Sequence, residues 1–521
     1  MNSALHELDM SHSNLSGPIP RPLWNLTDIE VLSLSYNHLD GTTSQFLRFE
    51  KLRELLLGNN NLDGRLEFLS FNSSWTQLET LEFPSNSLTG PIPSNLEGPI
   101  PNSLLNQPSL RIFLLSHNSI SGQIDAAICN LKALNVLKLR SNTLEGTIPQ
   151  CLGEMNEYLW NLDLSNNNLS GTINTTFSIG NYLTIISLHG NKLMGKVPRS
   201  LINCKHLRLL DLGKDELNDT FPNWLGDLPD LQILNLRSNK LHGPIKSSGN
   251  RDLFVQLHFM DLSSKGFSGN LAESFFENFQ AMKIIVKSAG IPQYIFDQFS
   301  GYYDNYLMTI TTKGQDHDSV PILTSNMIID LSKNKFEGHI PNIIGDLVGL
   351  RTLNLSHNVL EGHIPASLQN LSVLESLDLS SNKISGEIPP QLASLTFLAV
   401  LNLSHNHLVG CIPKGKHFDT FENSSYQGND GLRGFPPSRD CGGDDMVPQA
   451  TIPVDLDQEE EDSIPMISWQ AVFMGYGCGL VIGLSIIYIM LSTQYPTWFS
   501  RMVVKLEYRI TTRMKKHKKR Y

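Results

Sequence analysis

The sequence is organised around one phrase, Leu-x-Leu-x-x-Asn-x-Leu-x-Gly, which returns about every 24 residues. The position of its second leucine can be followed from Met10 to Leu403, with steps of 24, 23, 26, 32, 24, 25, 24, 24, 24, 26, 69, 24, 24 and 24 residues. A fixed period of this length is typical of a solenoid, in which each repeat buries its apolar face only against its neighbours. The pattern predicts fifteen stacked repeats and favours recognition by an extended surface.

Residues 371–389 show what one repeat builds. Their apolar residues follow one another at steps of 3, 3, 2 and 5, which fits neither a helix nor a long strand. We expect one short strand at 376–380, with its leucines in the core and Ser376, Asp378 and Ser380 facing outward, because strand side chains alternate. The predicted fold class is an α/β-type repeat solenoid, a right-handed superhelix with a parallel concave sheet.

An asparagine marks the point where the chain leaves each strand, as at Asn382. A buried asparagine there can satisfy backbone groups of two adjacent repeats that would otherwise be unpaired. One such residue per repeat indicates a structural ladder rather than a catalytic or metal-binding row. Equivalent residues are Asn37, Asn60, Asn86, Asn118, Asn142, Asn167, Asn191, Asn239, Asn334, Asn358 and Asn406.

The 69-residue step separates about eleven repeats in residues 1–271 from four repeats in residues 327–413. A long insertion in a compact array is usually functional, and aromatic residues suit interfaces, so we interpret residues 272–326 as an interaction island. The alternative is a flap that packs on the solenoid, and both interpretations stay open. The aromatic residues of the island are Phe275, Phe276, Phe279, Tyr294, Phe296, Phe299, Tyr302, Tyr303 and Tyr306.

Residues 414–467 combine a predicted terminal cap with an acidic run at 455–462 that we interpret as a solvated stalk. Cys411 and Cys441 flank the cap and are a candidate disulfide. Cys129 and Cys151 lie in neighbouring repeats and form a second candidate pair, whereas Cys204 fits a small buried position. One or two disulfides indicate an oxidising compartment.

The segment 468–491 carries no charge, and its last 21 residues are long enough to cross a bilayer as one transmembrane helix. The tail at 492–521 has nine Lys or Arg residues against Glu507. Its net charge of +8 within the chain's −11 leaves −19 for residues 1–467. Because basic residues stay on the cytoplasmic side, we predict a single-pass type I protein with its repeats outside the cell.

Gly475, Gly479 and Gly483 lie four residues apart in this segment and share one helix face. Small residues let a second helix approach closely, so we predict a helix-pairing surface; the alternative is the general abundance of glycine in membrane helices. The ending from Lys518 to Tyr521 places its lysines as in an endoplasmic-reticulum retrieval signal, and attraction to anionic lipids explains the same lysines. The expected location is the plasma membrane, with transit or retention in the endoplasmic reticulum as the alternative.

Asn-x-Ser/Thr sequons agree with an extracellular location and supply ten candidate N-glycosylation sites. They are Asn14, Asn25, Asn72, Asn168, Asn174, Asn218, Asn354, Asn370, Asn402 and Asn423. The first residues already read as the middle of a repeat, without a signal peptide or a preceding cap. We therefore expect the sequence to be a fragment or an amino-terminally truncated form.

The ending Leu-x-Gly-x-Ile-Pro recurs at 15–20, 88–93, 144–149, 360–365, 384–389 and 408–413, and resembles the plant-type extracellular leucine-rich repeat. Island, stalk, span and basic tail together resemble plant leucine-rich-repeat receptor-like proteins. The stretches 425–434, 475–483, 493–499 and 515–521 resemble the Cf class of tomato disease-resistance proteins.

This resemblance implies a plasma-membrane immune receptor that detects a protein or peptide from a pathogen, or another apoplastic molecule. Proteins of this class lack a kinase, so it also implies signalling through a partner receptor-like kinase. That co-receptor would pair through the transmembrane helix and the C-terminal repeats.

Ligand specificity is expected on the outward positions of the concave sheet. The last repeats are nearly uniform there, whereas earlier repeats vary. Ordinary solvated surface is the alternative for any one position. The varying candidates are Tyr36, Leu56, Glu82, Leu114, Lys138, Arg140, Asp163, His189, Asp211 and Arg237.

An enzyme is the weakest of the function classes. Thirty residues of tail cannot hold a kinase domain, and scattered histidines such as His189, His357 and His405 are expected on the repeat surface. We expect no cofactor, no metal site and no nucleic-acid partner. Two alternatives to a receptor are a truncated non-signalling decoy and a cell-wall-associated inhibitor that binds proteins, although the span argues against the inhibitor.

Overall fold

The computed structural model divides the chain into two units, residues 1–442 and 443–521, and every residue that it describes lies in the first. The described residues are 5–20, 23, 25–42, 49–65, 77–90, 92, 107–155, 158–174, 176–245, 253–264, 266–286, 307–312, 315–321, 323–415 and 418–434. Several predicted features lie outside them: the span 468–491 with Gly475, Gly479 and Gly483, the tail 492–521, Cys441 and Asn72. Among the helices that are described, none has the length and apolar character needed to cross a membrane.

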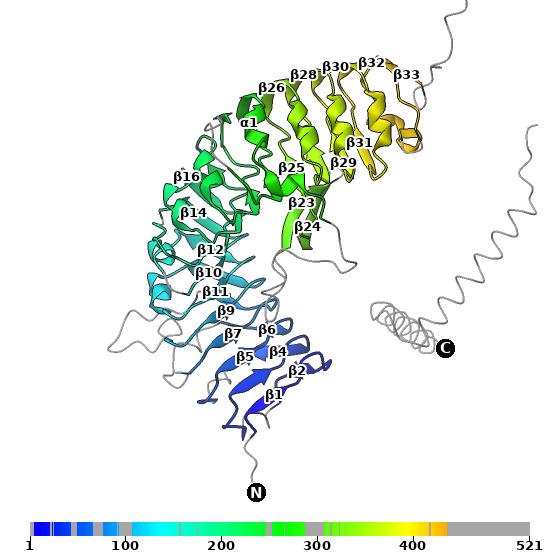
Figure 1. The fold of residues 1–521 in the computed structure, drawn as a ribbon. Coiled ribbons are helices and arrows are strands. Elements are labelled where there is room, and N and C mark those ends of the chain that lie inside the picture. The colour runs from blue at the N-terminus through cyan, green and yellow to red at the C-terminus, as the bar shows by residue number, and fades with distance from the viewer. Residues whose placement is uncertain are drawn as a thin grey trace, which may run out of the picture. The chain divides into compact units, whose positions relative to one another are not determined.

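One parallel sheet of fifteen strands runs through the first unit, along the inner side of its curve (Figure 1). Its strands confirm the fifteen repeats that the spacing predicted, each strand being three residues long. They are β1 (Glu7–Asp9), β3 (Val31–Ser33), β5 (Glu54–Leu56), β7 (Thr80–Glu82), β9 (Ile112–Leu114), β11 (Val136–Lys138), β13 (Asn161–Asp163), β15 (Ile185–Ser187), β17 (Leu209–Asp211), β19 (Ile233–Asn235), β21 (Phe259–Asp261), β25 (Ile328–Asp330), β27 (Thr352–Asn354), β29 (Ser376–Asp378) and β31 (Val400–Asn402).

A second set of parallel strands follows the asparagine turns and forms three shorter sheets. The first holds β2 (Ser16–Pro18), β4 (His38–Thr42) and β6 (Asn61–Asp63). The second holds β8 (Thr89–Gly90), β10 (Ser119–Gln123), β12 (Thr143–Gly146), β14 (Asn168–Thr172), β16 (Lys192–Gly195) and β18 (Glu216–Leu217). The third holds β20 (Gly243–Pro244), β22 (Phe267–Asn270), β26 (Lys335–His339), β28 (Val359–Gly362), β30 (Lys383–Glu387), β32 (His407–Cys411) and β33 (Gly431–Arg433).

In seven of the described repeats a short 3-10 helix lies on the side away from the long sheet (Figure 1). Several begin directly after a proline such as Pro341 or Pro365, whose φ of −64° suits the entry to a helical turn. They are η5 (Ala126–Asn130), η6 (Gln150–Gly153), η7 (Arg199–Asn203), η8 (Asn223–Asp227), η11 (Asn342–Asp346), η12 (Ala366–Asn370) and η13 (Pro390–Ser394). Gly386, with φ +80°, lies in β30 before η13, in a backbone conformation that only glycine adopts without strain.

The leucines of the phrase form a continuous apolar core from Ile19 to Leu432. Leu137 and Leu139 of one repeat and Leu210 and Leu212 of another are at most 1% exposed. Because each repeat buries these side chains only against its neighbours, the core is elongated and runs from repeat to repeat.

The asparagine ladder is confirmed. Asn382 Oδ1 accepts from Leu360 N at 3.0 Å, and its Nδ2 donates to the carbonyl oxygens of Leu355 and Leu379, both at 3.0 Å. One side chain thus satisfies backbone groups of two repeats, as expected from the cost of leaving them unpaired. Asn429 makes the equivalent bonds beyond the last repeat.

Asp215 occupies the ladder position between Asn191 and Asn239. Its Oδ1 accepts from Leu193 N at 3.0 Å, but its buried Oδ2 has no hydrogen-bond partner. In Asn191 the corresponding atom is Nδ2, which donates to backbone carbonyls. Burial raises the pKa of Asp215 to about 8, so we expect its carboxyl to hold a proton at neutral pH.

The first part of the island packs on the solenoid. α1 (Glu273–Phe276) and η9 (Gln280–Lys283) bury Phe275, Phe276 and Phe279 in edge-to-face contact, with ring centroids 5.2 to 5.8 Å apart. For these three residues the interface interpretation is wrong and the packing alternative holds. A hairpin of β23 (Leu307–Thr312) and β24 (Gln315–Pro321) follows, and the aromatic residues from 294 to 306 lie outside the described residues.

The last repeat is covered by residues 418–434. η14 (Phe418–Thr420) and η15 (Asn423–Ser425) bring Phe418, Phe421 and Tyr426 onto the end of the core, and β33 extends the third of the shorter sheets. A terminal apolar face of a solenoid needs such a cover.

Candidate ligand-binding face

Three rows of outward residues cross the long sheet. Around the buried Leu137, Val136 belongs to the first row and Lys138 to the second, while Arg140, after the buried Leu139, belongs to the third. Successive members of a row are about 4.8 Å apart, the spacing of strands in a sheet. The sequence candidates occupy these rows: Leu56, Glu82, Leu114, Lys138, Asp163 and Asp211 the second, Arg140, His189 and Arg237 the third, and Tyr36 the next position.

The expected exposure of these candidates is correct for only half of them. Tyr36 is 47% exposed and stacks on His12, with ring centroids 4.3 Å apart. Four candidates are half-buried, namely Leu56, Glu82, Lys138 and Arg140. The other five are buried, because neighbours one strand away cover them: Leu114, Asp163, His189, Asp211 and Arg237.

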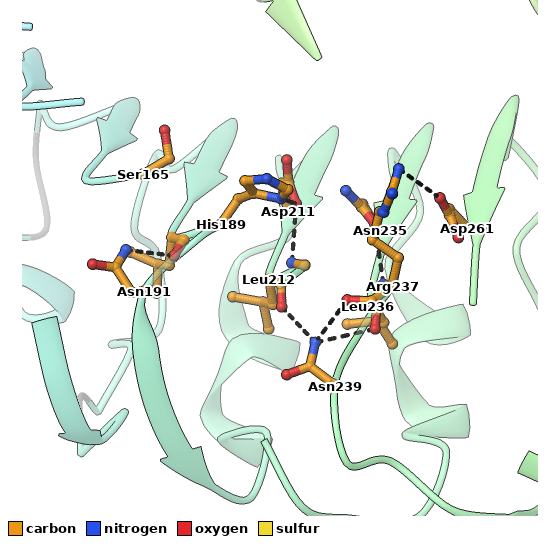
Figure 2. Close-up of polar contacts among 12 residues, drawn as sticks. Ser165, His189, Asn191, Asp211, Leu212, Asn235, Leu236, Arg237, Asn239 and Asp261 are labelled. Atoms are coloured by element: carbon orange, nitrogen blue, oxygen red, sulfur yellow. Dashed lines mark hydrogen bonds and ion pairs between the residues drawn. The ribbon is translucent and has the colours of Figure 1, made fainter. Parts of the chain in front are cut away.

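The four polar ones among these buried candidates form directed contacts, and Figure 2 shows His189, Asp211 and Arg237. Asp163 Oδ1 accepts from the backbone N and the hydroxyl of Ser165, at 3.0 and 2.6 Å. His189 Nδ1 lies 3.3 Å from Asp211 Oδ1, and both side chains are less than one-tenth exposed. The interpretation of His189 as a surface histidine is therefore wrong.

Gly213 makes room for the most polar part of the sheet. A Cβ atom there would stand 2.9 Å from His189 Nδ1, 3.0 Å from Arg237 Cγ and 3.0 Å from Asn235 Nδ2. The missing side chain lets these three residues converge, and Arg237 Nη1 reaches to 3.8 Å from Asp261 Oδ2. We call the resulting set, together with Asp163, the concave polar cluster; Figure 2 labels its other members, His189, Asp211, Asn235, Arg237 and Asp261.

The cluster ends at a pair of acids joined across the 69-residue step. Asp261 of β21 is in register with Asp330 of β25. Burial, followed by the nearby Asp330, raises the pKa of Asp261 to about 7, although Arg237 opposes this shift. Burial also raises the pKa of Asp330, whose Oδ2 accepts from Asn354 Nδ2 at 3.1 Å.

An apolar strip runs beside the cluster in the first row. Its members are buried although they point away from the main core, since they alternate with the core leucines. They are Val136, Ile185, Leu209, Ile233, Phe259 and Ile328.

Sequence reasoning missed this strip, as well as Gly213, Asn235 and Asp261. Their row positions repeat at 24 to 26 residues, so the same spacing that located Asp211 and Arg237 could have found them.

The predicted glycosylation sites divide by exposure. Asn14, Asn25, Asn168, Asn174, Asn218, Asn370 and Asn423 are exposed. Asn354 is buried on the long sheet, where Nδ2 donates to Asp330 and Oδ1 accepts from Ser356, so this sequon is not available in the fold and its prediction is wrong. Asn402 is half-buried in an equivalent position, with Nδ2 3.4 Å from Asp378 Oδ2. The phrase Leu-Asn-Leu-Ser creates both sequons.

The cysteines follow the expectation where they are described. Cys129 and Cys151 form a disulfide between two neighbouring repeats, with Cα atoms 6.1 Å apart. Cys411 is also disulfide-bonded, and its pairing with Cys441 stays a prediction. Cys204 is buried, which raises the pKa of its thiol to about 12 and leaves it unreactive.

Leucine-rich-repeat family models match residues 181–241 and, singly, 4–26, 109–131, 158–178, 349–371 and 373–395. The chain is 66% identical to the receptor-like protein Cf-9 homolog of Solanum lycopersicum, over 92% of this chain and 63% of the relative. It is also 66% identical to the receptor-like protein 9DC1 of Solanum pimpinellifolium, over 100% of this chain and 67% of the relative. The chain therefore spans about two thirds of the length of these relatives.

Among solved structures, the Arabidopsis receptor kinase HAESA, in complex with the peptide hormone IDA and the co-receptor SERK1, superposes with a TM-score of 0.61. It is 28% identical, and the match covers 83% of this chain and 66% of HAESA. The plant peptide hormone receptor RGFR1 in complex with RGF2 gives a TM-score of 0.62 at 26% identity, over 80% of this chain and 62% of the receptor.

Proposed function

The chain belongs to the plant leucine-rich-repeat receptor-like proteins, a non-enzymatic family, and from this premise we propose that it is a cell-surface immune receptor. Its concave sheet recognises a pathogen-derived or other apoplastic peptide or protein, and a partner receptor kinase carries the signal. The observation that carries this proposal is the concave polar cluster, which interrupts otherwise regular rows.

The cluster has the physical properties of a recognition site. Its side chains stand on strands and are held by their neighbours, so little conformational freedom is lost when a ligand binds. His189 and Arg237 pair with acids in a partly desolvated setting, where charge contributes more to specificity than it does on an open surface.

The fold relatives support a peptide ligand and a co-receptor. HAESA is known in complex with a peptide hormone and SERK1, and RGFR1 in complex with RGF2. For this chain we place the kinase partner on the C-terminal repeats and on the glycine face at Gly475, Gly479 and Gly483.

The proposed location is the plasma membrane, with the repeats outside the cell. The disulfide between Cys129 and Cys151 supports an oxidising compartment, and seven exposed sequons, among them Asn168 and Asn370, support passage through the secretory route.

The ligand-binding part is tested in leaves that express the full chain and receive apoplastic fluid from infected leaves. The double variant His189→Ala/Arg237→Ala should lose the oxidative burst, because it removes the two side chains that contact acids across strands in the cluster. Lys132→Ala/Lys205→Ala, which changes two exposed lysines off the sheet, is the matched control. An undiminished burst from the first variant, at equal surface amounts, would disprove recognition by the cluster.

The partner part is tested by co-purification from the same leaves. Changing Gly475, Gly479 and Gly483 together to leucine should reduce recovery of receptor kinase several-fold, since bulky side chains hold helices apart. Equal recovery would remove the helix-pairing proposal and leave the ligand site unaffected.

A further inference from the structure

Immediately before the island, the ladder position is not an asparagine. Counting three residues from the second leucine of the phrase, Leu262, leads to Lys265 where Asn239 and Asn334 stand in the flanking repeats. Lys265 lies outside the described residues, but the residues around it are described. The amide that joins adjacent repeats elsewhere is therefore missing from the sequence at this point.

A direct approach of the two main chains replaces the amide. Gly266 comes so close to the preceding repeat that a Cβ atom would stand 2.0 Å from the carbonyl oxygen of Leu241. Gly243 N donates to Gly266 O at 3.3 Å, and the buried Ser264 donates its hydroxyl to Asn239 O at 2.9 Å. No residue larger than glycine fits this junction without moving the backbone.

A cavity of about 450 Å³ lies beside this junction, and we call it the ladder-gap cavity. Arg237 and Lys240 line it from one repeat, Asp330 and Lys333 from the repeat after next, and Ser263 and Ser264 from the repeat between them. It shares Arg237 with the concave polar cluster, so it continues the candidate ligand-binding face.

The charges of this cavity favour an anion. Lys333 is exposed and forms no ion pair within the described part of the chain. Lys240 pairs with Glu216 at 2.9 Å, but both side chains are about half exposed, so this pair is weak and can exchange partners. Asp330 is the acid in the lining, and burial raises the pKa of its carboxyl.

We propose that the ladder-gap cavity binds a carboxylate of the recognised peptide or protein, either its C-terminal group or an acidic side chain. Guanidinium and ammonium groups form their strongest hydrogen bonds with such oxyanions. Partial enclosure strengthens the attraction relative to open solvent. This inference rests on the proposed function, because it assigns part of the ligand to a definite place.

The test uses the full chain purified in detergent and three small probes at constant ionic strength. N-acetyl-Gly-Gly carries a terminal carboxylate, N-acetyl-Glu-amide carries a side-chain carboxylate, and N-acetyl-Gly-Gly-amide carries none. Calorimetry should show saturable binding of at least one acid probe and none of the amide. The acid that binds more tightly identifies the source of the carboxylate.

Lys240→Gln/Lys333→Gln should weaken binding of the acid probe at least about tenfold, while the control Lys132→Gln/Lys205→Gln leaves it unchanged. Lys240 and Lys333 are both exposed in the wild type. The variant should therefore unfold at the wild-type temperature. Equal binding of the amide, or wild-type binding by the first variant, would overturn the proposal.

A separate reading in leaves distinguishes this inference from the proposed function. Lys240→Gln/Lys333→Gln should reduce the burst induced by apoplastic fluid. If that variant loses the acid probe but keeps the burst, the carboxylate does not belong to the ligand, and the inference fails while the proposed function stands. If His189→Ala/Arg237→Ala keeps the burst, recognition by the cluster fails whatever the probes show.

Discussion

The middle repeats, β13 to β21, and the last four, β25 to β31, share one scaffold but differ in their outward rows. In the last four, the acid or amide at the end of each strand accepts hydrogen bonds from the serine two residues later. Asp378 Oδ1 accepts from Ser380 N at 3.0 Å and Oγ at 2.6 Å, and Asn402 Oδ1 accepts from the same two atoms of Ser404. In β15, β17 and β19, His189, Gly213 and Arg237 occupy the serine position, and contacts run from His189 to Asp211 and from Arg237 to Asp261 on the next strand. The outer strands of the middle region, β13 and β21, keep the serine, at Ser165 and Ser263. The core and the ladder carry the fold, and the outer rows are left free to differ.

The largest effect should follow from breaking what the two regions share. Asn191→Ala in the middle and Asn382→Ala near the end each remove hydrogen bonds to several buried backbone groups. Each should cost about 3 to 5 kcal/mol, since every unsatisfied buried group costs about 1 to 3 kcal/mol and relaxation recovers part of it. Thermal unfolding of the two variants measures this, and a clear difference between them would show that the scaffold is not equivalent in the two regions.

A pH effect should arise in the middle region, where Asp215 replaces the ladder asparagine. Its folded-state pKa of about 8 lies above the ordinary 3.8, so the folded form binds the proton more tightly. Its contribution to stability is full below pH 4, falls as the pH rises, and is lost above pH 8.

Asp215→Asn should flatten the decline of Tm between pH 5 and 9 and stabilise the chain by about 2 kcal/mol at pH 8. Asp261, with its pKa raised to about 7, leaves a residual slope of the same sign. An identical Tm profile for wild type and variant would contradict a protonated Asp215.

Filling the gap in the cluster should have an intermediate effect. Gly213→Ala places a methyl group within 3.0 Å of Arg237 Cγ and 2.9 Å of His189 Nδ1, and overpacking of this kind costs about 1 to 3 kcal/mol. The leaf response should fall with it, because the convergence of the cluster is lost. Wild-type stability and response together would show that the residues reposition freely.

The smallest effect is expected at the end of the molecule. Ser380→Ala and Ser404→Ala each remove one partly buried hydroxyl contact and should cost about 1 kcal/mol or less. Neither should alter the burst in leaves. A loss of response from either would extend the ligand-binding face into the uniform repeats.

The sequence was sufficient to predict the fold because its period is a property of single repeats. Fifteen strands, the buried leucines and the ladder asparagines such as Asn382 follow from spacing and alternation alone. Burial of the outward residues depends on what stands one strand away, which spacing does not show. His189 is covered because Gly213 and Asp211 shape its surroundings.

The same limit explains the other corrections. Phe275, Phe276 and Phe279 belong to an irregular segment, so their packing against Phe254 and Phe221 could not be deduced from a period. Asn354 satisfies the glycosylation pattern, yet its amide donates a hydrogen bond to Asp330 on the adjacent strand. Features that recur with the period, including the ladder hydrogen bonds between repeats, were predictable, whereas the burial of these particular side chains was not.

The disulfide between Cys129 and Cys151 fastens the fifth turn of the spiral to the sixth. Unfolding that begins at β1 proceeds one repeat after another, because each repeat is stabilised only by its neighbours. When unfolding reaches this disulfide, the two linked repeats cannot separate freely, because the disulfide closes a loop between them. The disulfide precedes β13, where the concave polar cluster begins. It therefore limits the spread of unfolding from the amino-terminal repeats into the cluster.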